Sequence, residues 1–159
     1  MKLIDVLPIF TERLVLKQTS RDDIDLILKM DKQVDTQKFL GGIKDKSREE
    51  RLAFLDKKNS KGNSLTVFLN NKPIGFVGLK VTDNSGEISY IFDSDYIGSG
   101  YATECVIKLI DIGFNELGLD YLYANSKEDN IASKKVLLKT GFKFKKIIDE
   151  FMYFELKRS

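Results

Sequence analysis

The sequence predicts a single α/β domain of the α+β kind, built on a mixed and mostly antiparallel sheet with helices on its faces. Alternating apolar segments between residues 65 and 92 are typical of an antiparallel meander. A glycine loop and an amphipathic helix, residues 102–117, follow and lead into a short apolar strand. Because a helix joins the strands on either side of it, we expect these two to lie parallel. The chain has the length of one domain, which we assign to residues 1–159.

The first third of the chain contains one predicted strand and two capped helices. Leu14-Val15-Leu16 is the strand. Ser20 is a helix cap, because acidic residues and then apolar residues follow it up to Met30. The segment 31–45 is polar, and its paired glycines break any helix. Ser47 begins a second capped helix.

The later elements alternate between strands and helices. Residues 121–124 form a short buried strand after the central helix. Asp129 or Asn130 caps the last helix, which stops at Gly141. The apolar positions in residues 142–156 predict a closing β-hairpin. Three earlier strands share the alternating pattern and are joined by turns of Asn, Asp, Pro and Gly: residues 65–69, 74–81 and 87–92.

Charge and composition exclude several classes of function. The net charge of +2 gives no strong basic field, so we expect no nucleic-acid partner. The chain has no membrane-length apolar run and no signal peptide, so we expect a cytoplasmic protein without a membrane partner. With no histidine and a single cysteine, it lacks His-based nucleophile pairs and imidazole or thiolate metal sites, and we expect no metal. Cys105 is predicted to be a buried, inert thiol.

A glycine loop joins the strand that ends near Phe92 to the central helix, through Gly98 and Gly100. Glycine has no Cβ, so the backbone can bend tightly and a ligand can approach it closely. The first N–H groups of the following helix have no intrahelical partner and lie at the positive end of its dipole, where phosphate binds well. We predict that this loop binds a pyrophosphate; the alternative is an ordinary turn before a helix.

Three segments, in this order, resemble the GNAT acetyltransferase superfamily, and in particular its branch that acetylates ribosomal-protein N-termini (RimJ/RimL-like). Residues 98–104 are similar to that branch's Gly-x-Gly-Tyr-Ala-Thr-Glu form of the acetyl-CoA loop. Residues 130–142 are similar to its Asn-x-x-Ser helix ending in Lys-x-Gly-Phe, and residues 11–16 match its first strand. Together the segments span nearly the whole chain. The resemblance implies a GNAT-like sheet in which the parallel strand pair splays apart.

The resemblance also implies acetyl-CoA as the cofactor and CoA as the product. A backbone N–H at the end of the strand before the loop, in Ile91, Phe92 or Asp93, is implied to polarise the thioester carbonyl. The pyrophosphate is implied to bind the backbone N–H groups of the loop and the first helical turn: Gly98, Ser99, Gly100, Tyr101, Ala102 and Thr103.

The last helix is implied to contact the rest of the cofactor. Asn130 would bond the pantetheine arm, and Ser133 would lie near the sulfur and steady the departing thiolate as a catalytic residue. The alternatives are a helix cap for Asn130 and close packing for Ser133. Lys139 is a candidate ligand of the 3′-phosphate, although most helical lysines are simply solvated. Leu137 occupies the position where many superfamily members carry a tyrosine acid, so that residue cannot supply the proton here.

Glu87 is the predicted catalytic base, acting directly or through water on an amine acceptor. It lies near the start of the strand that leads to the loop, and partial burial would have to raise its pKa. The alternative is a solvated charge at a strand end. Glu104 is the rival base, but the helix dipole favours an acid at its position whatever its function.

The acceptor side is predicted from loops and strand alternation. Glu87 and Tyr90 would face the acceptor; the alternative for Tyr90 is a position in the core. The loop of residues 31–43 is expected to select the acceptor, with Phe39 as the wall of its pocket. A protein N-terminus and a small primary amine, such as a polyamine, an amino acid or an aminoglycoside, both stay open.

Two other classes of function are compatible with the same loop. One is a non-catalytic CoA-binding or sensor domain of the same fold, and the other is a protein that binds a different phosphate ligand. Loss of rate without loss of cofactor affinity, on mutation of Glu87, separates an enzyme from a sensor. Monomer and homodimer are both consistent with the sequence.

Overall fold

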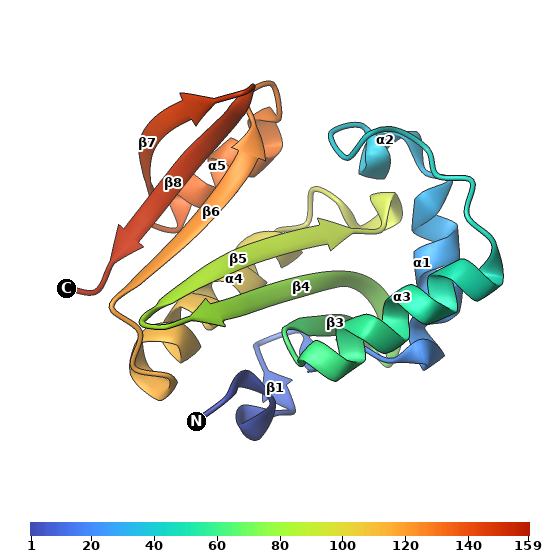
Figure 1. The fold of residues 1–159 in the computed structure, drawn as a ribbon, viewed down its shortest axis with the longest axis horizontal. Coiled ribbons are helices and arrows are strands. Elements are labelled where there is room, and N and C mark those ends of the chain that lie inside the picture. The colour runs from blue at the N-terminus through green and yellow to red at the C-terminus, as the bar shows by residue number, and fades with distance from the viewer.

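An eight-stranded mixed sheet carries the fold (Figure 1), in a computed structural model that describes residues 1–159. Its strands lie in the spatial order β1-β2-β3-β4-β5-β6-β8-β7. Only β5 and β6 run parallel, and every other neighbouring pair is antiparallel. The predicted class and the mixed, mostly antiparallel sheet are confirmed. The strands are β1 Ile9–Phe10, β2 Val15–Gln18, β3 Ser64–Leu69, β4 Lys72–Thr82, β5 Ser85–Phe92, β6 Tyr121–Lys127, β7 Lys143–Ile148 and β8 Phe151–Lys157.

Five α-helices cover the two faces of this sheet. Figure 1 shows α3 and α1 beside β3 and β4, whereas α4 passes behind β5, and α5 behind β6 and β8. A short helix, α2, follows α1 and lies near the end of β5. The helices are α1 Ile24–Asp31, α2 Val34–Gln37, α3 Arg48–Lys61, α4 Tyr101–Asp111 and α5 Ile131–Lys139.

Apolar side chains are buried on both faces of the sheet, because alternate strand residues point to opposite sides. The main cluster has 22 buried residues and joins the sheet to α4; Leu79 of β4 and Val106 of α4 are both members. A smaller cluster of Ile24, Ile27 and Leu55 packs α1 against α3, with Phe76 of β4 beneath it. The sheet is therefore the middle layer of three.

Polar capping sets the starts of the first helices as predicted. The Ser47 hydroxyl accepts from the Glu50 N–H at 3.1 Å, and the Glu50 carboxylate accepts from the Ser47 N–H at 3.2 Å. This reciprocal pair satisfies two N–H groups that the helix itself cannot. Ser20 forms the same kind of box with Asp23, ahead of α1.

The parallel strands β5 and β6 stay paired over only three positions. Ser85, Gly86 and Glu87 face Tyr121, Leu122 and Tyr123, and pairing stops there. Figure 1 shows the two strands diverging beyond this point, so that the sheet opens in a V between them. We call the space between the diverging strands the gap. Its sides are formed by the edges of β5 and β6 that face each other, where the backbone groups beyond the three paired positions have no partner strand.

Several elements differ from the sequence prediction. The strand β1 and the single-turn helix α2 were not expected, since runs this short carry no clear periodicity. The central helix is α-helical only to Asp111 and continues as a π-helical turn, where the Leu117 N–H donates to the Ile112 carbonyl at 2.9 Å. The strand β6 is longer than residues 121–124, because β8 pairs with it as far as Lys127.

The C-terminal hairpin completes the core. Met152 and Phe154 of β8 are buried, and the Phe154 ring meets the Phe144 ring edge-on with centroids 6.0 Å apart. The apolar run at residues 151–154 is thus a core strand of this chain. In this fold, no helix has the length and apolar character needed to span a bilayer.

Candidate active site

The glycine loop lies at the carboxyl end of β5 and leads directly into α4. Gly98 and Gly100 have positive φ angles of 94° and 84°, which side-chain-bearing residues rarely adopt. Gly100 caps α4, and a Cβ added at Gly98 would meet nothing within 4 Å, so the space above the loop is open. None of the six backbone N–H groups from Gly98 to Thr103 donates to a protein acceptor. The expected cluster of free donors at a helix start is therefore formed.

Glu104 of α4 is fastened to the segment that precedes β2. Its carboxylate accepts from the Thr11 hydroxyl, from the Arg13 N–H at 2.9 Å and from the Arg13 Nε at 2.6 Å. Burial favours the neutral form of Glu104, but these hydrogen bonds from Thr11 and Arg13 outweigh it and hold its pKa below the usual value. A carboxylate used in this way is a structural anchor, so Glu104 is not available as the base.

Arg13 extends the same anchor to the glycine loop. Its Nη1 donates to the Ser99 carbonyl at 3.0 Å, and its guanidinium lies 4.5 Å from the centre of the Tyr101 ring. The contact orients the loop by its carbonyl and leaves its N–H groups free. Sequence reasoning missed this link, although both segments that it joins, residues 11–16 and 98–104, had been singled out separately.

The end of β5 directs one predicted N–H into the gap. The Asp93 N–H donates to the Ile74 carbonyl of β4 at 2.9 Å, and Ile91, two residues earlier, also faces β4. Successive residues of a strand send their N–H groups to opposite sides. The Phe92 N–H therefore points toward β6, at a level where β6 is no longer paired. Of the three predicted carbonyl donors, Phe92 alone has this orientation.

The Asp93 side chain belongs to a buried polar cluster instead. It is 1% exposed and accepts from the Lys29 Nζ at 2.7 Å, the Gln33 Nε2 at 2.9 Å and the Asp95 N–H at 3.0 Å. Burial favours its neutral form, but these bonds, led by that from Lys29, keep the pKa of Asp93 below its usual value. The cluster ties α1 and α2 to the end of β5, with the Thr36 hydroxyl donating to the Phe92 carbonyl at 3.0 Å.

Helix α5 places Ser133 against Tyr90 of β5. The two hydroxyl oxygens are 2.9 Å apart, and the Tyr90 hydroxyl also donates to the Ser133 carbonyl at 3.2 Å. Burial raises the pKa of Tyr90, and the hydrogen bond with Ser133 only partly opposes this. Asn130 caps α5 by accepting from the Ser133 N–H at 3.1 Å. This is the helix-cap role predicted as the alternative to a contact with pantetheine. Leu137 is fully buried.

Two further predicted residues lie apart from this pair. Lys139 lies in the last turn of α5, exposed and without an ion-pair partner. Cys105 is fully buried, and burial raises the pKa of its thiol to about 12. A thiol in that environment stays protonated at neutral pH, in agreement with the inert role that the sequence predicted.

Glu87 lies where β5 and β6 part. It faces Tyr123 across the last paired position of the two strands and is half-buried. Its Oε2 is 3.4 Å from the Asn125 Nδ2, a weak contact from the next residue of β6 on the same face. No cation lies within ion-pair distance of its carboxylate. Glu87 therefore borders the gap with its carboxylate weakly bound.

A cavity of about 650 Å³ lies on the face of the sheet that α1 and α3 cover. Its walls come from α1, α3, the connection between α2 and α3, and the strands β4 and β5. Glu87, Tyr90 and Ile91 line it from β5. Phe39 does not line this cavity, whereas its neighbour Leu40 does. Both Glu87 and Tyr90 belong to this lining, but they point to opposite faces of β5, and the Tyr90 hydroxyl reaches Ser133 of α5. Phe39 lies outside the lining.

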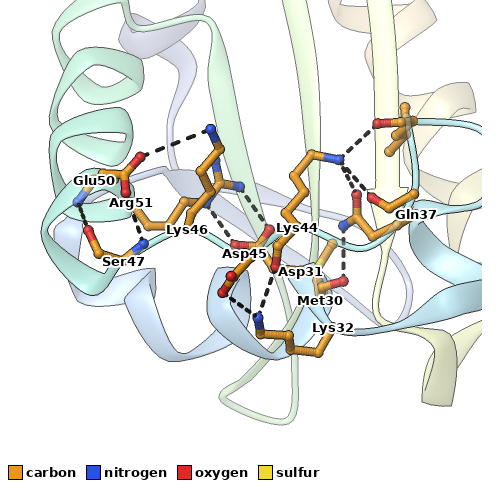
Figure 2. A network of polar contacts seen from close by, with 12 residues as sticks. Met30, Asp31, Lys32, Gln37, Lys44, Asp45, Lys46, Ser47, Glu50 and Arg51 are labelled. Carbon is orange, nitrogen blue, oxygen red and sulfur yellow. Dashed lines mark hydrogen bonds and ion pairs between the residues drawn. The ribbon is translucent and has the colours of Figure 1, made fainter.

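A network of polar contacts holds the connection between α1 and α3 beside this cavity (Figure 2). The Lys44 Nζ donates to the Gln37 Oε1 at 2.7 Å and to the Leu40 carbonyl at 2.8 Å. The Arg51 Nη2 donates to the Asp31 Oδ1 at 3.0 Å, with Nε 2.9 Å from Oδ2 in an ion pair without hydrogen-bond geometry. No local sequence motif predicts these contacts, because they join residues up to 20 positions apart.

Comparison with known proteins identifies the family to which this domain belongs. The family model of the acetyltransferase (GNAT) domain matches residues 13–143. The uncharacterised N-acetyltransferase p20 of Bacillus licheniformis is 26% identical over 171 aligned positions, which cover 94% of this chain and 96% of that protein. A GNAT-family acetyltransferase structure from Bacillus anthracis superposes with a TM-score of 0.81 at 24% identity, covering 94% of this chain and 97% of that one.

A spermidine N-acetyltransferase from Vibrio cholerae, solved with CoA and spermine, has the same fold. Its TM-score is 0.78 at 18% identity, over 91% of this chain and 95% of that one. Since the family model covers most of the sequence, the chain belongs to the GNAT acetyltransferase family. It is an acetyl-CoA-dependent acetyltransferase, and acetyl-CoA is its cofactor.

Proposed function

We propose that this enzyme transfers the acetyl group of acetyl-CoA directly to a primary amine that enters the cavity lined by Glu87. One observation supports this most strongly: Glu87 borders both the cavity and the gap, since it lies at the last paired position of β5 and β6. The free N–H groups of the glycine loop lie at the far end of the same strand. The gap is thus the place where this chain can bring a thioester and an amine together.

The cofactor is held chiefly by backbone groups in this proposal. The N–H groups of residues 98–103 bind the pyrophosphate, helped by the positive end of the α4 dipole. Asn130 and Ser133, at the start of α5, contact the pantetheine arm, and Lys139 attracts the 3′-phosphate. Acetyl-CoA supplies an acetyl group activated as a thioester.

Glu87 and Phe92 act on the two reactants. Glu87 accepts a proton from the incoming ammonium, directly or through water, and so frees the lone pair of the amine. The Phe92 N–H donates to the carbonyl oxygen as negative charge develops on it. The new C–N bond forms as the C–S bond breaks, the nitrogen then gives up its second proton to water, and no acyl-enzyme is needed.

Tyr90 and Ser133 receive the departing thiolate. Because burial raises the pKa of Tyr90, its phenol stays protonated at neutral pH and can donate. The Ser133 hydroxyl, 2.9 Å away, orients that phenol and offers a second donor. Tyr90, on β5, thus serves as the general acid, a role that Leu137 on α5 cannot fill.

The test is a pair of measurements on Glu87→Gln: isothermal titration with acetyl-CoA, and thiol release with a panel of amines and N-terminal peptides. We expect kcat to fall about a hundredfold, a typical loss for a general base, while the affinity for acetyl-CoA stays within about twofold. Tyr90→Phe, in the same assays, should lower kcat by about tenfold. Glu155→Gln on β8, outside the cavity and the gap, is the matched control.

The outcomes separate the alternatives. Acetyl-CoA binding by the wild type without thiol release on any amine would favour a non-catalytic sensor. An unchanged kcat in Glu87→Gln would remove Glu87 from the mechanism. No binding of acetyl-CoA would contradict the role given to residues 98–103.

A further inference from the structure

The charges that line the acceptor cavity are strongly unbalanced. Two carboxylates, Asp31 and Glu87, belong to the lining. Five cationic side chains from the connection after α2, from α3 and from β4 line the same cavity: Lys44, Arg51, Lys58, Lys61 and Lys80. The whole chain carries a net charge of only +2, so this local excess is a property of the cavity.

One carboxylate and one cation of the lining neutralise each other. Asp31 and Arg51 form a close pair through both guanidinium contacts, and their side chains are 2% and 13% exposed. Figure 2 shows Asp31 and Arg51 among the side chains of the connection between α1 and α3. Each charge is matched by its partner, so neither is free for a ligand. Glu87 is then the single carboxylate facing four lysines.

None of these four lysines is paired with a carboxylate. No Asp or Glu carboxylate oxygen lies within 4.0 Å of the amino nitrogens of Lys44, Lys58, Lys61 or Lys80. Lys44 is bound by neutral oxygens only, and Lys58 lies over the Phe54 ring at 5.3 Å. Neutral partners leave the positive charges of the cavity uncompensated.

The lysines at one end of the cavity also act on one another. Burial lowers the pKa of Lys58, and repulsion from Lys61, Lys80 and Lys57 lowers it further. Lysines that repel one another in this way create a region of positive potential. A bound anion would reduce the repulsion between them. Lys80 lies opposite Glu87 on the adjacent strands β4 and β5, so the positive region adjoins the predicted base.

We propose that the acceptor is an amine that also carries an anionic group, a carboxylate or a phosphate, which the lysines Lys58, Lys61 and Lys80 bind while Glu87 receives the amine. This inference rests on the proposed transfer to an amine and narrows its substrate class. A polycation such as spermine or an aminoglycoside would meet repulsion here, in contrast to the acceptor of the Vibrio cholerae enzyme.

The test compares amines that differ in charge, by kcat/KM for thiol release from acetyl-CoA. The panel is O-phosphoethanolamine, β-alanine, ethanolamine and spermidine, which present a phosphate, a carboxylate, no anion and extra cations. We expect at least one anionic amine to be preferred about tenfold or more over ethanolamine, and spermidine to be the poorest. Which anionic amine is preferred distinguishes a phosphate from a carboxylate.

Two double variants locate the preference. Lys58→Met with Lys80→Met removes two lysines of the cavity, whereas Lys143→Met with Lys146→Met on β7 removes equal charge outside it. The ratio of kcat/KM for the preferred anionic amine to that for ethanolamine should fall about tenfold in the first variant. In the control variant the ratio should keep its wild-type value.

Three results would overturn the inference or separate it from the proposed function. A preference for ethanolamine or spermidine, or an equal ratio in both double variants, overturns the anionic acceptor while the transferase function stands. If no amine causes thiol release from acetyl-CoA, the proposed function fails. Titration of CoA-saturated protein with O-phosphoethanolamine and β-alanine then decides whether the anion site exists. Binding of either that is lost in the cavity variant upholds the anion site, and no binding of either overturns it.

Discussion

In the proposed function, the two regions beside the gap between β5 and β6, a cofactor side and an acceptor side, recognise their ligands in different ways. On the cofactor side, six consecutive N–H groups at the start of α4 are free, and side chains serve mainly to orient the loop that carries them. On the acceptor side, the cavity is lined by side chains from α1, α3, β4 and β5 and from the connection between α2 and α3. The first site depends on backbone geometry and the second on which side chains the fold brings together.

This difference decides how each site responds to mutation. A backbone site is indifferent to most side chains, but it fails when its conformation or its anchor is changed. A side-chain site keeps its shape when single residues change, but its selectivity follows their charge. The buried cluster around Asp93 joins the two, because it ties α1 and α2 to the strand that ends at the glycine loop.

The largest expected effect on cofactor binding is that of losing the Glu104 anchor. Glu104→Ala leaves Thr11 and Arg13 without their acceptor and frees the glycine loop. We expect the affinity for acetyl-CoA to fall about thirtyfold and the free energy of unfolding by about 2 kcal/mol, as for other charged hydrogen bonds. Isothermal titration and urea unfolding measure the two quantities.

Glu116→Ala is the control for that variant. Glu116 is an exposed acid that follows the same helix and has no ion-pair partner, so both quantities should keep their wild-type values. If Glu104→Ala bound acetyl-CoA as tightly as this control does, the anchor would have no role in shaping the loop.

A matched pair of glycines tests the comparison itself, with a smaller effect. Gly98 on the cofactor side and Gly41 on the acceptor side have similar φ angles of 94° and 91°, and both have open space around the missing Cβ. Alanine at either position costs about 1 kcal/mol of strain. Gly98→Ala should lower the affinity for acetyl-CoA about tenfold, because its Cβ would enter the open space beside the loop, where the proposed function places the pyrophosphate. Gly41→Ala should leave that affinity at the wild-type value, and equal losses in both would mean that strain alone is responsible.

The smallest expected effect is the pH dependence of the anchor. The pKa of Glu104 is lowered in the folded chain relative to the unfolded value of about 4.3. A group of this kind stabilises the fold above the unfolded pKa, and its contribution is lost as pH falls through the folded pKa. The difference in unfolding free energy between the wild type and Glu104→Gln should be about 1 kcal/mol at pH 7 and should shrink below about pH 4. A difference that stays constant from pH 7 to pH 3 would contradict this.

Local patterns were sufficient to predict the order of the strands and helices. The alternation in residues 65–92 predicted the meander, and Ser20 and Ser47 marked helix starts that the structure confirms. The short elements β1 and α2 escaped because two to four residues show no period, and their positions depend on neighbours. The π-helical turn at Ile112–Glu116 escaped for a related reason, since its apolar pattern is still that of a helix.

The candidate site divides in the same way. Gly98, Gly100 and the segment after them could be found from the sequence, because a glycine loop before a helix has a local signature. The structure chose Phe92 among three adjacent N–H donors by the register of β4 and β5, which no local pattern specifies. It also assigned the two acids, with Glu104 bound by Thr11 and Arg13 and Glu87 left at the cavity.

By itself, the sequence determined the class of fold, the place of the glycine loop and the absence of histidine chemistry, since each depends on residues close together in the chain or on composition alone. Only the tertiary structure decided which distant residues meet: Glu104 with Arg13, 91 positions apart, and Tyr90 with Ser133, 43 positions apart. It also gathered four lysines of separate elements around one cavity. The physical reason is that packing of the sheet between two layers of helices, rather than any local propensity, sets those distances.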